Sequence, residues 1–203
     1  MQYLVCILIG YFMGCINPSY IIGKLRGVNI KKSGSGNAGA SNALLLFGKA
    51  VGVFCALFDI IKAFGAIKIC EAIYSDEPYI FSVTAVAAIL GHIFPFYMKF
   101  RGGKGLASFW GMTVALNWKL GLIAALVILL ATVITDYIVI GTFSTIALVP
   151  AYTGLVLTNW TMALIVFLAS AMIFCKPFEN IGRLIRKEEL GLRSAIRGDN
   201  RIK

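Results

Sequence analysis

The sequence predicts an all-α integral membrane protein, because of its composition, the length of its apolar stretches and the placement of its basic residues. Of its 203 residues, 59% are hydrophobic and 14% are charged, and the mean hydropathy is +0.85. Apolar stretches recur along the chain, and a helix needs about 20 apolar residues to cross the bilayer core. Because backbone polar groups in lipid must be hydrogen-bonded within their own segment, these stretches indicate a helical bundle.

About seven of these stretches are expected to be membrane-spanning helices. They cover residues 3–23, 50–74, 79–98, 105–117, 120–135, 137–157 and 160–176. The first lacks a basic leading segment and a small-x-small cleavage site, so we expect a retained helix rather than a signal peptide.

The basic residues predict the orientation of these helices. Most of the 19 lysines and arginines fall within residues 24–49, 99–104 and 176–203. Cytoplasmic loops of membrane proteins carry such an excess of positive charge, so the N-terminus is expected outside and the C-terminus in the cytoplasm. The net charge of +10 thus indicates orientation, and no nucleic acid is expected as a partner. We expect one membrane-embedded domain over residues 1–203, with a basic cytoplasmic tail at about 177–203.

The segment before residue 135 leaves an alternative topology. A single long helix over residues 106–134 would give six spans and would place the C-terminal tail opposite the other basic clusters. We therefore expect a short fourth span and a hairpin at Asn117. A span of this length reaches only about 20 Å, so it should lie beside a thinned or polar region of the membrane.

Charged and metal-binding residue types are scarce within the apolar stretches. Asp59 and Lys62 are three residues apart and share a helix face, which fits either an ion pair facing the bundle or a direct role in a site. The five cysteines form no C-x-x-C pair and fit packing roles better than disulfides or metal ligands. His92 is the single histidine, so no metal site is expected.

Two glycine-rich segments lie on the expected cytoplasmic side and favour anion binding. "SGSGNAGASNALLLFGK" covers residues 33–49, and the apolar residues after Asn42 predict a helix that begins there. Backbone N–H groups gathered at such a helix start can bind a phosphate. "GHIFPFYMKFRGGKGLAS" covers residues 91–108 and adds the cation of Lys104. Met98 and Gly105 break the nucleotide-binding pattern G-x-x-x-x-G-K-[ST], so that motif is excluded.

Each of these features also has a purely structural interpretation. The second segment fits a tight membrane turn whose Lys104 reaches the membrane surface. His92 fits a helix-capping or core histidine, and Asn180 fits the cap of a surface helix. The basic residues that follow Asn180 fit anchors to anionic lipid.

Three motifs together resemble the bacterial acyl-phosphate:glycerol-3-phosphate acyltransferases, which are small integral membrane enzymes. "GSGNAGASN" at 34–42 is similar to the family pattern G-S-G-N-x-G-x-T-N. The segment at 91–108 is similar to G-H-x-x-P-x-F-x-x-F-x-G-G-K-G-x-A-T, and "ENIGRL" at 179–184 is similar to E-N-I-x-R-L. The motifs occur in the family's order along nearly the whole chain.

The resemblance implies a seven-helix bundle in the bacterial cell membrane, with an active site at the cytoplasmic face. It implies acyl transfer from acyl phosphate to the 1-hydroxyl of glycerol 3-phosphate, giving lysophosphatidic acid, with membrane lipids as surroundings and with no metal or cofactor. The catalytic residues that it implies are Ser35, Lys104, His92 and Asn180. The substrate- and phosphate-binding residues that it implies are Gly34, Gly36, Asn37, Gly39, Asn42, Gly102, Gly103, Gly105 and Glu179.

The chain departs from the family patterns at positions linked to binding and catalysis. Leu45 stands where the family has an arginine, and Pro177 stands where it has a histidine. These departures leave two alternatives open. One is a divergent paralogue with a changed acceptor or lost activity. The other is a non-catalytic membrane protein that binds or transports an anion.

Overall fold

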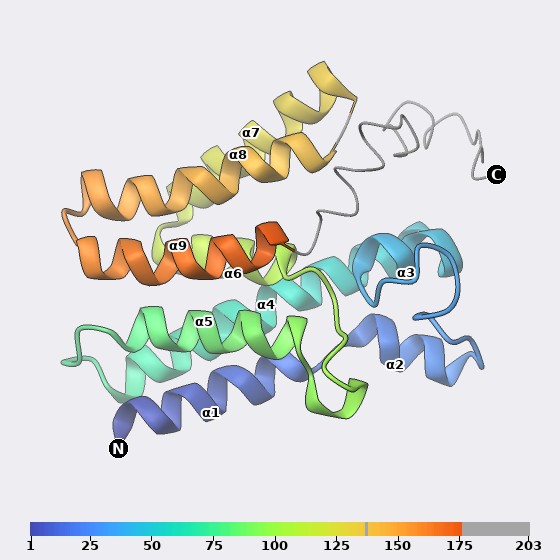
Figure 1. Ribbon diagram of the computed structural model, residues 1–203, viewed down its shortest axis with the longest axis horizontal. Coiled ribbons are helices and arrows are strands. Elements are labelled where there is room, and N and C mark those ends of the chain that lie inside the picture. Colours follow the sequence, from blue (N-terminus) through green and yellow to red (C-terminus); the bar gives the residue numbers. More distant parts are fainter. Residues whose placement is uncertain (137, 176–203) are drawn as a thin grey trace. The chain divides into compact units, whose positions relative to one another are not determined.

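The computed structural model describes residues 1–136 and 138–175 (Figure 1). Within these residues the chain forms helices and connecting turns and no strand, which confirms the all-α prediction for this part. The chain forms two compact units, Met1–Asn117 and Trp118–Lys203, and each is described below by itself. The single domain expected over residues 1–203 stays a prediction, and the expected basic tail lies outside the described residues.

The first unit contains every described residue of the two glycine-rich segments. Its elements are α1 (Gln2–Cys15), α2 (Pro18–Leu25), α3 (Ala40–Phe47), α4 (Lys49–Ile73), α5 (Ile80–Ile93), the 3-10 turn η1 (Phe96–Met98) and α6 (Leu106–Leu116). Helix α1 packs against α5, and α4 packs against α1, α3, α5 and α6.

Small residues let α1 and α5 approach each other closely. A Cβ atom added at Gly10 would lie 2.6 Å from the carbonyl oxygen of Thr84, and one added at Gly14 or Gly91 would overlap the facing backbone. Helices in lipid associate largely through such close packing, because lipid tails provide little hydrophobic driving force. This contact fixes the end of α5, where His92 lies.

The described part of the second unit, residues 118–136 and 138–175, contains three longer helices. They are α7 (Trp118–Thr135), α8 (Ile138–Ala151) and α9 (Trp160–Cys175), and the π-helical turn η2 (Tyr152–Val156) follows α8. Helix α8 packs against both α7 and α9. The single long helix over 106–134 is absent, because α6 ends at Leu116 and Asn117 has extended backbone angles (φ −158°, ψ 116°).

Four of the described segments are long and apolar enough to cross a membrane. They are Gln2–Leu25, Lys49–Ile73, Ile80–Met98 and Trp118–Thr135. Three shorter apolar helices are Leu106–Leu116, Ser144–Val156 and Trp160–Ile173. The count of seven spans and the orientation of the two termini therefore stay predictions.

The first of these segments is interrupted, which the expected span at 3–23 did not anticipate. Helix α1 ends at Cys15, and α2 begins at Pro18, which has no N–H to donate. Asn17 caps α2, since its Oδ1 accepts a hydrogen bond from the Tyr20 backbone N–H at 2.8 Å. An Asn-Pro pair is a known turn signal and could have revealed the break.

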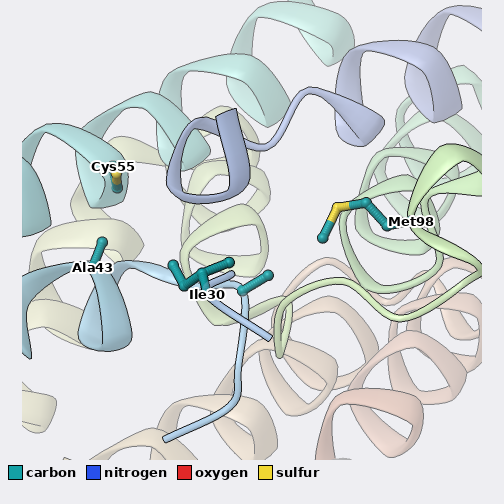
Figure 2. Packing of buried hydrophobic residues seen from close by; sticks show 5 residues of the cluster. Ile30, Ala43, Cys55 and Met98 are labelled. Atoms are coloured by element: carbon teal, nitrogen blue, oxygen red, sulfur yellow. The ribbon is translucent and has the colours of Figure 1, made fainter. Parts of the chain in front are cut away.

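A small hydrophobic cluster holds the first glycine-rich segment to its neighbours. Figure 2 shows Ile30, Ala43, Cys55 and Met98, which come from the chain before α3, from α3, from α4 and from η1. Cys6, Cys15, Cys55 and Cys70 are all buried and unpaired, which confirms the packing role expected for these four.

Candidate active site

Two loops of the first unit meet at the ends of α5 and α6, and we call them the first loop (33–39) and the second loop (99–105). A Cβ atom added at Gly103 of the second loop would lie 3.0 Å from the carbonyl oxygen of Ala38 in the first. The Lys31 Nζ, just before the first loop, donates to the Met98 carbonyl oxygen at 2.8 Å. The two segments that the sequence singled out therefore lie together.

Asn42 holds the first loop in shape. Its Oδ1 accepts from the Ser35 N–H at 2.8 Å, and its Nδ2 donates to the carbonyl oxygens of Ile30 and Ser33, both at 2.9 Å. Its side chain is fully buried. The expected helix start at Asn42 is wrong, because α3 begins at Ala40 and Gly39 is its N-cap residue. The Asn42 amide braces the loop.

Glycine is required at two positions of the first loop. Gly34 and Gly36 have left-handed backbone angles, with φ of 61° and 71°. A Cβ atom at Gly34 would also overlap the Asn42 Oδ1. Ser35, between them, is exposed, and Asn37 is half-buried.

The second loop folds back onto the end of α5. The Gly102 N–H donates to the Ile93 carbonyl oxygen at 2.9 Å, and the Gly103 N–H donates to the His92 carbonyl oxygen at 3.1 Å. A Cβ atom at Gly103 would overlap the His92 Nε2. Both N–H groups bond to the backbone in this structure, and the phosphate-binding roles expected for Gly102 and Gly103 stay predictions. Both glycines pack closely against His92.

Lys104 and Gly105 connect the second loop to α6. Lys104 is half-buried, and Gly105 is buried with a left-handed φ of 88°. Gly105 is the N-cap residue of α6, so Lys104 lies directly before the N-terminal turn of that helix. Helix N-termini favour negative charge, and a lysine next to one adds to this preference.

Further basic residues lie within the second loop and just before the first. The pKa of Lys31 is lowered from its ordinary value, first by burial and then by the positive charges of Arg101 and Lys99. Mutual repulsion of this kind shows that three cations share one small region. Such a region attracts anions, because a bound anion relieves the repulsion.

His92 is buried and connects the second loop to an ion pair. Lys62 Nζ lies 2.6 Å from Asp59 Oδ1, and both side chains are 2% exposed, so the expected ion pair facing the interior is confirmed. His92 Nδ1 lies 3.0 Å from Lys62 Nζ and 3.3 Å from Asp59 Oδ1. Of the two roles open for His92, the core position is thus observed, and its catalytic role stays a prediction.

The break between α1 and α2 is part of the same cluster. The Ile16 carbonyl oxygen accepts from Lys62 Nζ at 2.6 Å, and the Cys15 carbonyl oxygen accepts from the Tyr97 hydroxyl at 2.7 Å. Asn17 Nδ2 donates to the Ala38 carbonyl oxygen at 2.9 Å. None of these three contacts followed from the sequence patterns, which treated the first span as continuous.

An apolar groove of about 680 Å³ begins at this break. Its walls come from α1, α2 and η1, and they include Phe12, Ile16, Ile21, Phe96 and Tyr97. Lys24 lines it as well. The segment that forms one wall, η1, leads directly into the second loop.

A family model described as glycerol-3-phosphate acyltransferase matches residues 4–187 of the chain. The chain belongs to this family. Glycerol-3-phosphate acyltransferase 1 of Oceanobacillus iheyensis is 40% identical to it over 96% of this chain and 97% of that relative. Glycerol-3-phosphate acyltransferase 2 of Thermotoga maritima is 40% identical to it over 90% of this chain and 92% of that relative.

Two solved structures share the architecture. One is PlsY (YgiH), an integral membrane glycerol 3-phosphate acyltransferase, in its glycerol 3-phosphate form. The match has a TM-score of 0.89 and 26% identity and covers 96% of this chain and 98% of that one. The other is PlsY (YgiH) in its lysophosphatidic acid form. This match has a TM-score of 0.80 and 27% identity and covers 94% of this chain and 95% of that one. This member of the acyltransferase family is thus an integral membrane protein of phospholipid synthesis.

The family's third motif lies outside the described residues. Glu179 and Asn180 therefore keep their expected roles as predictions, and so does the departure at Pro177. Leu45, where the family resemblance implies an arginine, lies on α3 with its side chain 46% exposed. Within residues 1–136 and 138–175, no three His, Cys, Asp or Glu side chains are grouped to hold a metal ion.

Proposed function

We propose that this protein transfers a fatty acyl group from acyl phosphate to the 1-hydroxyl of glycerol 3-phosphate. The products are lysophosphatidic acid and inorganic phosphate. One observation supports this most directly. The two glycine-rich loops, with their basic residues, and the apolar groove lie next to each other in the first unit. The related PlsY structures in glycerol 3-phosphate and lysophosphatidic acid forms support the same acceptor and product.

The phosphate groups of both substrates require cations and hydrogen-bond donors at one place. Lys31, Lys99 and Arg101 supply shared positive charge, and Lys104 lies beside the N-terminus of α6. We place Ser35, exposed on the first loop, among the donors. A charge-assisted contact to phosphate contributes about 1.5–3 kcal/mol, so a few such contacts are enough to position the substrates.

The acyl chain requires an apolar surface that begins near the phosphate site. The groove of about 680 Å³ fits a single fatty chain in size, and its η1 wall continues into the second loop. Its position at the edge of α1 and α2 lets the chain enter from the lipid. We expect the active site at the cytoplasmic face of the bacterial cell membrane, because the basic clusters favour that orientation.

The reaction itself needs few groups from the protein. The acceptor hydroxyl oxygen forms a bond to the carbonyl carbon, the bond from that carbon to the phosphate oxygen breaks, and the hydroxyl proton ends on the released phosphate. Holding two reactants in line contributes roughly 7–11 kcal/mol, and donors near the developing oxyanion add to it.

An assay with purified protein in bilayers tests this proposal. Acyl phosphate and glycerol 3-phosphate together should give lysophosphatidic acid and phosphate in equal amounts. Acyl-coenzyme A in place of acyl phosphate should give neither. Product formation from acyl-coenzyme A alone would refute the donor, and acyl transfer to another acceptor in place of glycerol 3-phosphate would favour the divergent paralogue.

A further inference from the structure

The apolar groove has a wall that is built from aromatic rings in contact with one another. The ring centroids of Phe12 and Phe96 lie 6.2 Å apart in an edge-to-face contact. Tyr97 continues this row, with its ring centroid 5.5 Å from that of Phe96 and 5.8 Å from that of Tyr20. All four side chains line the groove. The row therefore leads from α1 through η1 to α2, and Tyr97 makes the contact with α2.

The Tyr97 hydroxyl fixes the orientation of this ring. It donates to the Cys15 carbonyl oxygen at 2.7 Å, at the break between α1 and α2. Cys15 lines the same groove, so the phenol connects two of its walls. The family pattern given above for residues 91–108 has phenylalanine at this position, so the hydroxyl is an addition to that pattern. The ring contacts and the hydrogen bond together hold the ring in place.

A fixed aromatic wall affects which chain shapes the groove can bind. Dispersion contacts are lost steeply when two surfaces separate, and packed side chains move little to restore them. A saturated chain can lie straight along the rings, whereas a cis double bond bends the chain and moves one half of it away from them. A groove whose wall does not move therefore favours the straight chain.

We propose that Tyr97 is a specificity-determining residue, which selects straight saturated acyl chains over chains bent by a cis double bond. Its ring provides the contact surface, and its hydroxyl keeps the ring in place through Cys15. Without the hydroxyl, the ring can rotate and the Cys15 carbonyl oxygen loses this donor, so the groove adapts to a bent chain. This inference rests on the proposed function, because the selected chain belongs to the acyl donor of that reaction.

Three acyl phosphates of equal chain length test the selection in wild-type protein in bilayers. Stearoyl phosphate is saturated, oleoyl phosphate has a cis double bond, and elaidoyl phosphate has a trans double bond that leaves the chain nearly straight. With glycerol 3-phosphate as acceptor, kcat/KM for the two straight chains should exceed that for oleoyl phosphate about 10-fold, the scale on which an apolar pocket discriminates. Equal values for all three, or a preference for oleoyl phosphate, would overturn the proposal.

Tyr97→Phe removes only the hydroxyl and tests its part in the selection. The preference for the straight chains should fall to about twofold or less, because the wall can then yield to the bent chain. The change concerns binding of the chain, so it should appear in KM for oleoyl phosphate, with kcat little changed. An unchanged preference in this variant would show that the hydroxyl does not fix the wall.

Tyr11→Phe is the matched control. The Tyr11 hydroxyl donates to the Phe94 carbonyl oxygen at 2.9 Å and so joins α1 to the same segment, but Tyr11 is not among the described residues that line the groove. Each variant loses one hydrogen bond to a backbone carbonyl oxygen, so both should lose similar thermal stability. Tyr11→Phe should keep the wild-type preference. The same loss of preference in both variants would attribute it to general loosening and overturn the role of Tyr97.

Binding of lysophosphatidic acid separates this inference from the proposed reaction. A lysophosphatidic acid with a photoreactive diazirine in its acyl chain should label the groove, and the stearoyl form should compete with it at lower concentration than the oleoyl form. This difference, with its loss in Tyr97→Phe, in a protein inactive with acyl phosphate would refute the proposed reaction and keep the selection. Equal competition by the two forms in an active protein would overturn the selection and keep the reaction.

Discussion

The two loops of the candidate active site are both rich in glycine, but they use glycine for different reasons. In the first loop, Gly34 and Gly36 adopt left-handed backbone angles, and the buried Asn42 amide holds the turn. In the second loop, Gly102 and Gly103 leave room for the end of α5, and their N–H groups bond to its carbonyl oxygens. Similar composition therefore does not mean that both loops offer N–H groups to a ligand.

The largest effect is expected from Gly103→Ala, because the new methyl group would overlap the His92 ring. The ring or the loop must move, and overpacking of this kind costs about 3 kcal/mol. Acyltransferase activity should fall at least about 100-fold in the steady-state assay, since His92 and Lys104 both shift.

Gly65→Ala is the control for this substitution. Its methyl group would meet only the end of Met13, at an ordinary 3.8 Å, on α4. It should leave activity and thermal stability near the wild-type values. Equal activity of the Gly103 and Gly65 variants would show that the second loop tolerates displacement and that its close packing is not needed.

Asn42→Ala should produce the next largest effect, in this case on stability. It removes three hydrogen bonds and leaves the Ser35 N–H and the Ile30 and Ser33 carbonyl oxygens without this partner. The free energy of unfolding should fall by about 2–3 kcal/mol, as measured by thermal or denaturant unfolding in detergent. Ser41→Ala is the control, because it changes the exposed neighbour of Asn42 on the same helix. It should change the free energy of unfolding by less than about 0.5 kcal/mol. A similar loss in both variants would contradict the bracing role.

Lys104→Ala should affect activity with little change in stability. Removing a charge-assisted phosphate contact costs about 1.5–3 kcal/mol, which lowers kcat/KM by roughly 10- to 150-fold. Lys32→Ala, at an exposed lysine before the first loop, serves as the control and should stay within about twofold. Near-normal turnover of Lys104→Ala would leave this lysine as a membrane-surface anchor.

The smallest effect is expected from Leu45→Arg on α3. The exposed side chain has room for a guanidinium, which can bind phosphate with two parallel hydrogen bonds. KM for glycerol 3-phosphate should fall several-fold, with kcat little changed. A wild-type enzyme that saturates at low glycerol 3-phosphate and is impaired by Leu45→Arg would contradict the family position assigned to Leu45.

Apolar length and charge placement predicted the helical class, the break at Asn117 and the Asp59–Lys62 pair, because each depends on local spacing. The meeting of the two loops was also expected, since both coincide with basic clusters on one predicted side. Helix α3 was placed two residues late, because Ser41 and Asn42 resemble capping residues while the actual cap is Gly39.

Contacts between distant residues could not be predicted in the same way. The bonds of Lys62 to Ile16 and His92 join residues 46 and 30 positions apart. The Tyr97 hydroxyl reaches the Cys15 carbonyl oxygen across 82 positions. Such pairings depend on how the helices pack, and a residue pattern along one helix does not encode them.

The interruption between α1 and α2 has a consequence for how the protein is made. The carbonyl groups of Cys15 and Ile16 take their hydrogen bonds from Tyr97 and Lys62, which the ribosome adds much later. A newly inserted first segment lacks these donors, so its carbonyl groups must keep contact with water or with the insertion machinery until α4 and η1 arrive. The first segment therefore completes its insertion only together with later parts of the chain, and loss of Lys62 is expected to slow biogenesis.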